Sequence, residues 1–356
     1  MVAFRSCVSA IALALGLFAV SLAPAHAWDP GEYSTLAVLP DVAPGMPSSV
    51  EGLTVGPDGN IYVPSFGFNY AGALSGNAAL FVISPYGKIL RQVTVLNSSP
   101  HILGLGFNPF NGFLLLLDFG AGRVLHVDPV TGNSSIFVDT IPNSGLNALT
   151  FDKAGNVYFS DSFNGVIWTT GPKGGTPSVW SNDPLLGPGT GLTPPFGANG
   201  IEFNNEGTLM YVANTAYHQI IQIPVEAGGT AGKASIFITG INAPDGIAID
   251  QQGNLWVCAN QEDKITVLDP TGKVIAKLGD FNGINQGIVN GLLFPASPRF
   301  SNDGRTLYVS NLTLYLPYAG AEAAVDSAWT LQARQYTVEQ LRAEIPPLGK
   351  QGYGLQ

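Results

Sequence analysis

The strongest constraint on the fold is a repeat that occurs six times along the chain. Each copy has a short apolar stretch, a polar turn and a second apolar stretch, as in residues 245–259. Two apolar stretches around such a turn predict a β-hairpin. The first residues of the six copies are Glu51, Leu103, Asn147, Asn199, Asp245 and Ala296. Successive copies start 44 to 52 residues apart, a period typical of the four-stranded blades of a β-propeller.

The repeats therefore predict an all-β protein, a six-bladed β-propeller with four antiparallel strands in each blade. In the first blade the third and fourth strands are expected at Ala79–Ser84 and Ile89–Val95. The segment Tyr33–Pro40 precedes the first repeat and has the pattern of a strand without a blade of its own. Because an open sheet edge invites aggregation, we expect this N-terminal strand to close the last blade, which begins near Ala296.

The N-terminus has the pattern of a secretory signal peptide over residues 1–27. Arg5 supplies the positive charge, Ile11–Ala23 the apolar core, and Ala25–Ala27 the cleavage site. This pattern predicts an exported protein, periplasmic or secreted, whose residues 28–356 form one propeller. No later segment is long and apolar enough to predict a membrane span. With Cys7 removed, Cys258 is the remaining cysteine, which we interpret as a small buried apolar residue.

The charge of the chain limits its partners. The net charge is −10, 11% of the residues are charged, and there is no basic run. These values argue against nucleic-acid binding, which needs a positive surface. The sequence leaves the oligomeric state open.

The first residues of the six repeats should meet at one mouth of the central channel, because each begins the innermost strand of a blade. Glu51, Asn147, Asn199 and Asp245 carry oxygen donors. Oxygen donors without thiolate or imidazole suit Ca²⁺ or another hard divalent cation rather than zinc or copper. An alternative is that Asp and Asn before Gly simply form turns, which accounts for Asn199 and Asp245 but not for Glu51.

Four long connections are expected on the same face as these residues. Long loops over one mouth of a channel favour a binding site there, although plain surface elaboration is the alternative. The four connections are Pro64–Asn77, Ser181–Ala198, Gly279–Pro295 and Leu312–Ser327.

The repeats and the order of their oxygen-bearing residues resemble the senescence-marker-protein/gluconolactonase/luciferin-regenerating-enzyme family. The resemblance covers roughly Tyr33 to Val309. It implies a six-bladed propeller that holds Ca²⁺ through Glu51, Asn147, Asn199 and Asp245, with Asp245 also acting as base or nucleophile. It therefore implies a metal-dependent hydrolase of lactones or related esters.

Three further readings of the sequence stay open. Pro100-His101 resembles a Pro-His pair in the second blade of paraoxonases, so His101 is a second candidate catalytic base, although a loop histidine is the plainer interpretation. The alternative function is a non-catalytic propeller of the NHL type that binds a ligand or a protein. A synthase or lyase on the same scaffold is a third reading. The chain has no Gly-x-Ser-x-Gly motif and no HExxH motif, so serine-hydrolase and zinc-protease mechanisms have no support.

Overall fold

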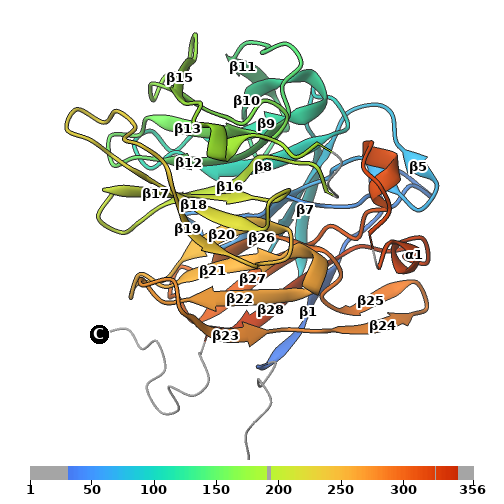
Figure 1. Ribbon diagram of the computed structural model, residues 1–356. Coiled ribbons are helices and arrows are strands. Elements are labelled where there is room, and N and C mark those ends of the chain that lie inside the picture. The colour runs from blue at the N-terminus through green and yellow to red at the C-terminus, as the bar shows by residue number, and fades with distance from the viewer. Residues whose placement is uncertain (1–30, 191–193, 325, 344–356) are drawn as a thin grey trace, which may run out of the picture.

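The structure, a computed structural model, describes residues 31–190, 194–324 and 326–343. Six four-stranded antiparallel sheets follow one another around a central channel in chain order (Figure 1). The innermost strand of each sheet contacts the innermost strands of its two neighbours. This confirms the predicted six-bladed β-propeller. The predicted signal peptide, residues 1–27, lies outside the described residues.

The first three blades follow the predicted strand pattern closely, and each runs from the channel outward. Blade 1 consists of β2 (Thr54–Val55), β3 (Ile61–Pro64), β6 (Ala79–Ile83) and β7 (Ile89–Thr94). Blade 2 consists of β8 (Ile102–Phe107), β9 (Leu114–Asp118), β10 (Arg123–Val127) and β11 (Ser134–Val138). Blade 3 consists of β12 (Leu146–Phe151), β13 (Val157–Asp161), β14 (Val166–Thr170) and β15 (Ser178–Ser181).

The last three blades repeat this plan, and the sixth takes its outer strand from the N-terminus. Blade 4 consists of β16 (Ala198–Phe203), β17 (Leu209–Asn214), β18 (Gln219–Pro224) and β19 (Ser235–Thr239). Blade 5 consists of β20 (Pro244–Ile249), β21 (Leu255–Ala259), β22 (Lys264–Leu268) and β23 (Val274–Leu278). Blade 6 consists of β26 (Pro295–Phe300), β27 (Thr306–Asn311), β28 (Thr337–Arg342) and β1 (Tyr33–Val38).

The ring is closed as predicted. Strand β1 pairs with β28 from Tyr33 opposite Leu341 to Val38 opposite Thr337, and it is the outermost strand of the last blade (Figure 1). Glu339 of β28 is buried at this closure and accepts a hydrogen bond from the Thr35 hydroxyl of β1 at 3.1 Å. Closure pairs the N-terminal strand with β28 and so covers the edge that β28 would otherwise expose.

The connections carry short elements of their own. Two small hairpins are formed by β4 (Phe68–Asn69) with β5 (Gly72–Ala73), and by β24 (Phe281–Asn285) with β25 (Ile288–Gly291). The helical turns are η1 (Phe119–Ala121), η2 (Pro184–Leu186), η3 (Asn260–Glu262), η4 (Leu316–Ala319) and α1 (Ser327–Thr330). None of these described helices is long and apolar enough to cross a membrane.

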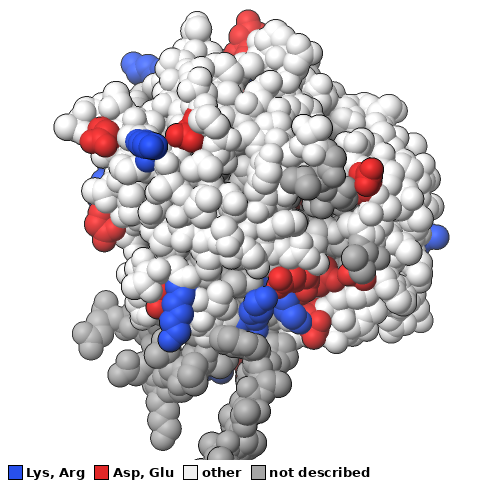
Figure 2. Space-filling model, in the orientation of Figure 1, with Lys and Arg blue, Asp and Glu red and all other residues white. Residues whose placement is uncertain are grey.

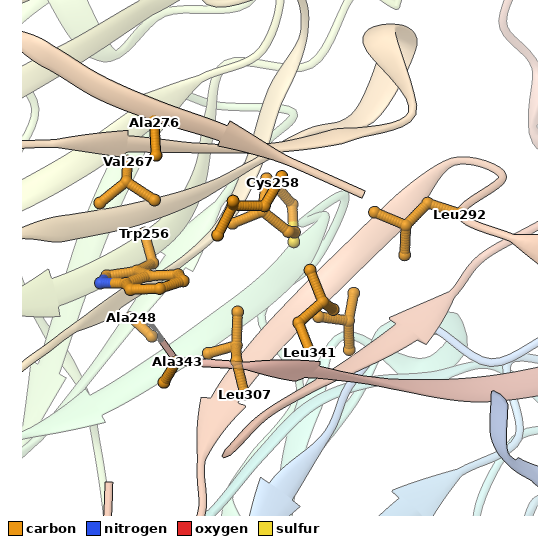
Figure 3. Packing of buried hydrophobic residues seen from close by; sticks show 12 residues of the cluster. Ala248, Trp256, Cys258, Val267, Ala276, Leu292, Leu307, Leu341 and Ala343 are labelled. Carbon is orange, nitrogen blue, oxygen red and sulfur yellow. The ribbon is translucent and has the colours of Figure 1, made fainter. Parts of the chain in front are cut away.

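The core lies between neighbouring sheets. Between blades 5 and 6 the side chains of Trp256, Cys258, Leu307 and Leu341 pack together with no exposed surface or almost none (Figure 3). Cys258 is a free thiol buried in this cluster, and burial raises its pKa well above the usual value. The prediction that Cys258 is a packing residue is confirmed. By contrast, the visible surface carries only scattered charged side chains (Figure 2).

A β-bulge lies at the same place in the inner strand of five blades. In blade 4, Ala198 pairs with Asn214 and Ile201 with Val212, so β16 has one residue more than β17 over this stretch. A bulge turns the side chains of its extra residues away from the regular alternation. The site residues of these five strands lie within the bulges, at Leu103, Asn147, Asn199, Asp245 and Ala296.

The glycines that follow several of these residues are explained by close approach of the inner strands. A Cβ atom on Gly200 would lie 2.2 Å from the Asp245 carbonyl oxygen, and one on Gly246 would lie 2.4 Å from the Ala296 carbonyl oxygen. Neither glycine has a positive φ. Asn199 and Asp245 are therefore strand residues beside a crowded backbone contact, and the interpretation of these Asp-Gly and Asn-Gly pairs as turns is wrong.

Candidate functional site

The four oxygen-bearing residues of the repeats come together in one pocket at the channel mouth. Glu51, Asn147, Asn199 and Asp245 all line this pocket. Their exposed fractions are 6%, 9%, 4% and 5%, so all four side chains are largely withdrawn from bulk water. Two carboxylates and two amides thus share a small volume from which most solvent is excluded.

The inner strands place these side chains at equivalent positions. Asn147, Asn199 and Asp245 are each the second residue of an innermost strand, one residue later than the sequence analysis predicts. Glu51 precedes β2 in the irregular start of blade 1, where Val50 forms an isolated bridge with Ser65. The shared bulge position explains why residues almost 200 positions apart reach one pocket.

Thr215 determines which way the Asn199 amide points. The Thr215 hydroxyl donates to the Pro244 carbonyl at 2.8 Å, so its oxygen accepts from the Nδ2 group of Asn199 at 3.0 Å. A hydroxyl has one proton to give, and here a carbonyl takes it. Oδ1 of Asn199 is consequently a buried acceptor with no hydrogen-bond donor among the described residues.

Asn260 has the equivalent effect on Asp245. Its Nδ2 group donates to Oδ2 of Asp245 at 3.0 Å and to the Pro295 carbonyl at 3.2 Å. Oδ1 of Asp245 is buried and has no hydrogen-bond donor within the described part of the chain. One carboxylate oxygen is thus held in place, while the other has no hydrogen-bond partner among the described residues.

The pocket disfavours the charged form of both carboxyl groups. Burial raises the pKa of Asp245 to about 7, although hydrogen bonding by the Asn199 and Asn260 side chains opposes this shift. Burial, together with repulsion from Asp245, raises the pKa of Glu51 well above its usual value. No Lys, Arg or His is among the described residues that line the pocket, so no side-chain cation compensates these charges.

This donor set fits a hard divalent cation. Two carboxylates would balance its charge, and the unpartnered oxygens of Asn199 and Asp245 are the kind of ligand that Ca²⁺ takes. The described residues contain no cluster of three or more His, Cys, Asp or Glu side chains, so the site depends on amide oxygens as well as carboxylates. The absence of thiolate and imidazole argues against zinc or copper.

The opposite side of the pocket is apolar. Leu103 lines it, as predicted, whereas Ala296 is buried in the cluster behind it. Three of the four long connections contribute lining residues, which are Phe66, Phe196, Leu312, Leu314, Leu316 and Ala319. The fourth connection, 279–295, supports this wall from behind through Leu293 and Phe294.

The three histidines within the described residues lie elsewhere. His101 is absent from the pocket lining, its Nδ1 atom is 2.7 Å from the Phe66 carbonyl oxygen, and its ring stacks on Phe68 at 4.5 Å. His126 stacks on Phe113 in blade 2, and the Nδ1 atom of His218 accepts from the Ala243 amide. The structure thus separates His101 from the four oxygen donors by the aromatic side chains of blade 1, and its role as a base stays a prediction.

Sequence reasoning missed a second ring of residues, which follow the second strand of each blade. In blades 3, 4 and 5 they are Ser162, Thr215 and Asn260, and each donates a hydrogen bond to a main-chain carbonyl of the following blade. In blades 1, 2 and 6 they are Phe66, Phe119 and Leu312. Each member stands 15 or 16 residues after the residue that opens the repeat of its own blade. This nearly constant spacing is the signal that could have found them.

Comparison with known proteins supports the resemblance. Residues 192–279, which include Asn199 and Asp245, match the model of the SMP-30/Gluconolactonase/LRE-like region. A gluconolactonase of Zymomonas mobilis is 26% identical over 234 residues, which are 56% of this chain and 58% of that protein. A lactonase drp35 of Staphylococcus haemolyticus is 26% identical over 142 residues, 37% of this chain and 41% of the relative. The aligned regions thus span about half the length of these relatives.

The fold comparison covers more of the chain. A solved structure described as a calcium-binding protein, regucalcin, from Agrobacterium tumefaciens superposes with a TM-score of 0.58 and 17% identity. The match covers 90% of this chain and 99% of that one. At this identity the likeness concerns the fold. The similarity of this chain to the senescence-marker-protein/gluconolactonase group of propellers is confirmed.

Proposed function

We propose that this protein is a calcium-dependent hydrolase of lactones or related esters. The observation that carries the proposal is the pair of buried carboxylates, Glu51 and Asp245, beside two amide oxygens with no basic side chain in the same pocket. The names of the two bacterial relatives, gluconolactonase and lactonase, agree with a lactone as the substrate. The calcium-binding description of regucalcin agrees with the proposed metal.

Glu51, Asn147, Asn199 and Asp245 are the proposed ligands. A Ca²⁺ ion bound by them would polarise the carbonyl of a lactone and stabilise the negative charge that develops on its oxygen during hydrolysis. Thr215 keeps the Asn199 carbonyl oxygen available as a ligand, since it occupies the amide nitrogen. Low solvent exposure strengthens each of these electrostatic interactions.

Asp245 is the proposed general base. Its Oδ2 atom is fixed by Asn260, and its Oδ1 atom is unpartnered among the described residues. Asp245 would accept a proton from a water molecule whose oxygen adds to the lactone carbonyl carbon. The ring carbon–oxygen bond then breaks, and the proton passes from Asp245 to the departing alkoxide. The product is a hydroxy acid that contains the atoms of the lactone and one water molecule, and Asp245 is again ionised.

The proposal is tested with purified protein, a panel of lactones and aryl esters, and matched reactions in EDTA and in excess Ca²⁺. We expect hydrolysis of at least one lactone in Ca²⁺, loss of activity in EDTA, and recovery when Ca²⁺ is restored. Titration calorimetry should give a stoichiometry of one Ca²⁺ per chain. Hydrolysis that is unaffected by EDTA, or tight Ca²⁺ binding without turnover of any substrate, would contradict it. The second outcome would favour a non-catalytic binding propeller.

A further inference from the structure

The apolar wall of the pocket comes mainly from blades 1, 2 and 6, and Phe196 adds to it from the connection between blades 3 and 4. Phe66 and Phe119 belong to the second ring, and Leu312, Leu314 and Leu316 follow β27. These five side chains face the same pocket as the four oxygen donors. The pocket is therefore divided into an oxygen-rich side and a hydrocarbon side.

Aromatic rings extend this wall toward the surface. Phe66 contacts Phe119 with ring centroids 5.8 Å apart, and Phe119 contacts Phe163 at 5.5 Å. Phe163 in turn stacks with Phe196 at 6.2 Å, and its side chain is 43% exposed. The series leads from buried rings in the pocket to a partly exposed ring, so an apolar group could remain in contact with aromatic carbon as it enters.

The wall is held rigidly by the backbone. The Leu312 amide donates to the Phe294 carbonyl at 2.9 Å, and the Thr313 amide donates to the Leu293 carbonyl at 3.3 Å. Leu312, Leu314 and Leu316 are 7%, 2% and 3% exposed, and they pack in one cluster with Leu103 and Phe294. A wall supported in this way favours binding of an apolar group, because its side chains lose little conformational entropy on binding.

Hydrogen-bond donors are scarce in the pocket. Ser162 lines it but gives its hydroxyl proton to the Ala198 carbonyl at 2.7 Å, and Asn199 gives its Nδ2 group to Thr215. The amide of Asn147 and the second amide proton of Asn199 are the remaining polar side-chain donors among the described lining residues. A ligand with several hydroxyl groups would leave most of them against leucine and phenylalanine, without partners.

We infer that the substrate is a lactone or ester that carries an apolar alkyl or aromatic substituent, rather than a polyhydroxylated sugar lactone. This inference rests on the proposed hydrolase function. The reacting carbonyl would lie at the oxygen donors, and the substituent would lie against Phe66, Phe119 and the 312–316 segment. The protein would thus differ in substrate from what the name of its Zymomonas relative describes.

The test compares δ-lactones that share one ring size. Unbranched alkyl chains of increasing length on the ring carbon next to the ring oxygen are measured against glucono-δ-lactone, with Ca²⁺ saturating. We expect kcat/KM to rise about fourfold per added methylene until the pocket is filled, since this is the gain from burying one methylene. Glucono-δ-lactone should be turned over at least 100-fold less efficiently than the best alkyl lactone, in keeping with a site that leaves polar groups unpaired. An equal or higher kcat/KM for glucono-δ-lactone would overturn the inference and leave the hydrolase function standing.

Matched variants locate the effect. Leu314→Ala removes hydrocarbon from the wall, and Ile236→Ala removes the same number of carbons from a half-exposed position on outer strand β19. We expect Leu314→Ala to flatten the dependence on chain length and Ile236→Ala to leave it unchanged. Phe163→Ser changes a partly exposed ring and should disturb folding less, so it replaces Leu314→Ala if that variant fails to fold. Unchanged selectivity in both the Leu314 and the Phe163 variants would contradict the assignment of the wall.

A binding measurement separates failure of the inference from failure of the proposed function. If no lactone is hydrolysed, the hydrolase function falls, and calorimetric titration with δ-decalactone and with glucono-δ-lactone then reports the ligand class. Preferential binding of δ-decalactone would keep the apolar specificity without the chemistry. Preferential binding of the sugar lactone, or binding of neither compound, would overturn the inference as well.

Discussion

The two sides of the channel mouth have the same backbone and opposite chemistry. On the side of blades 3, 4 and 5, Asn199 and Asp245 are each supported by a polar second-ring residue, Thr215 and Asn260. On the side of blades 1, 2 and 6, the second-ring positions are occupied by Phe66, Phe119 and Leu312. Glu51 is the exception, since it belongs to blade 1 but supplies a carboxylate.

This contrast shows that the repeated backbone places equivalent residues at the same site, while the residue type in each blade determines whether that place is polar or apolar. Blades 2 and 4 carry the same bulge, with Leu103 in one and Asn199 in the other. A cation site beside a hydrocarbon wall has an advantage for catalysis, because the wall excludes water and electrostatic interactions are stronger in a dry pocket. The following predictions change one side at a time.

The largest effect is expected from Asp245→Asn. At saturating Ca²⁺ the rate of lactone hydrolysis should fall about 1,000-fold or more, because the proposed base is lost. Asn260 already donates to one oxygen at this position, so the new amide oxygen should turn toward Asn260 and its nitrogen toward the pocket. Ca²⁺ affinity should therefore fall too, and it is measured by calorimetry alongside kcat. Full activity in this variant would eliminate Asp245 as the base and return attention to His101.

Glu51→Gln should act mainly on the metal. Removing one of the two carboxylates should weaken Ca²⁺ binding about 100-fold, and excess Ca²⁺ should restore part of the activity. A Ca²⁺ titration of kcat and KM distinguishes this result from loss of the base. If excess Ca²⁺ restores nothing while calorimetry shows the ion bound, Glu51 has a role in the chemistry.

The oxygen-rich side should make stability depend on pH when metal is absent. Burial raises the pKa of Asp245 to about 7 and that of Glu51 well above its usual value, so the folded protein holds protons that the unfolded chain releases. The stabilising contribution is complete below pH about 4 and is lost as pH rises to about 7. In EDTA the free energy of unfolding should fall by about 4 kcal/mol over this range from Asp245 alone, and Ca²⁺ should reverse the trend.

Urea denaturation at several pH values measures this dependence. Glu339 is a necessary control, because burial at the blade 6 closure also raises its pKa to about 7. The Asp245→Asn variant should lose part of the slope that Glu339→Gln retains. A metal-free protein with the same stability at pH 5 and pH 8 would contradict the raised pKa values.

The smallest effect is expected from Thr215→Val, which breaks the support of one ligand without touching the ligand itself. The valine cannot accept the Asn199 amide proton, so the amide is free to turn its nitrogen into the pocket. Ca²⁺ affinity should fall about tenfold, the lower end of the range for partners of metal ligands. Thr215→Ser keeps the hydroxyl and should behave like the unchanged protein. Equal losses in both variants would point to packing rather than to hydrogen bonding.

The sequence alone determined the architecture and the oxygen donors. Six repeats at a nearly constant spacing predict six blades, because each blade buries its faces only against neighbours of the same kind. The same register brings Glu51, Asn147, Asn199 and Asp245 to one pocket, since equivalent positions in a closed ring share one end of the channel. The closing strand Tyr33–Val38 could also be predicted, from the cost of an open edge.

Only the tertiary structure decided the other half of the site. The segment 312–319 and Phe196 lie in long connections without periodicity, so no local pattern predicts where their side chains go. The last blade takes its third strand from Thr337–Arg342, beyond a connection that itself forms the pocket wall. Thr215 and Asn260 have roles that depend on hydrogen bonds with the neighbouring blade, and such contacts exist only once the ring has closed. Repetition therefore specified where the four oxygen donors lie, whereas the apolar wall depends on contacts between segments far apart in the chain.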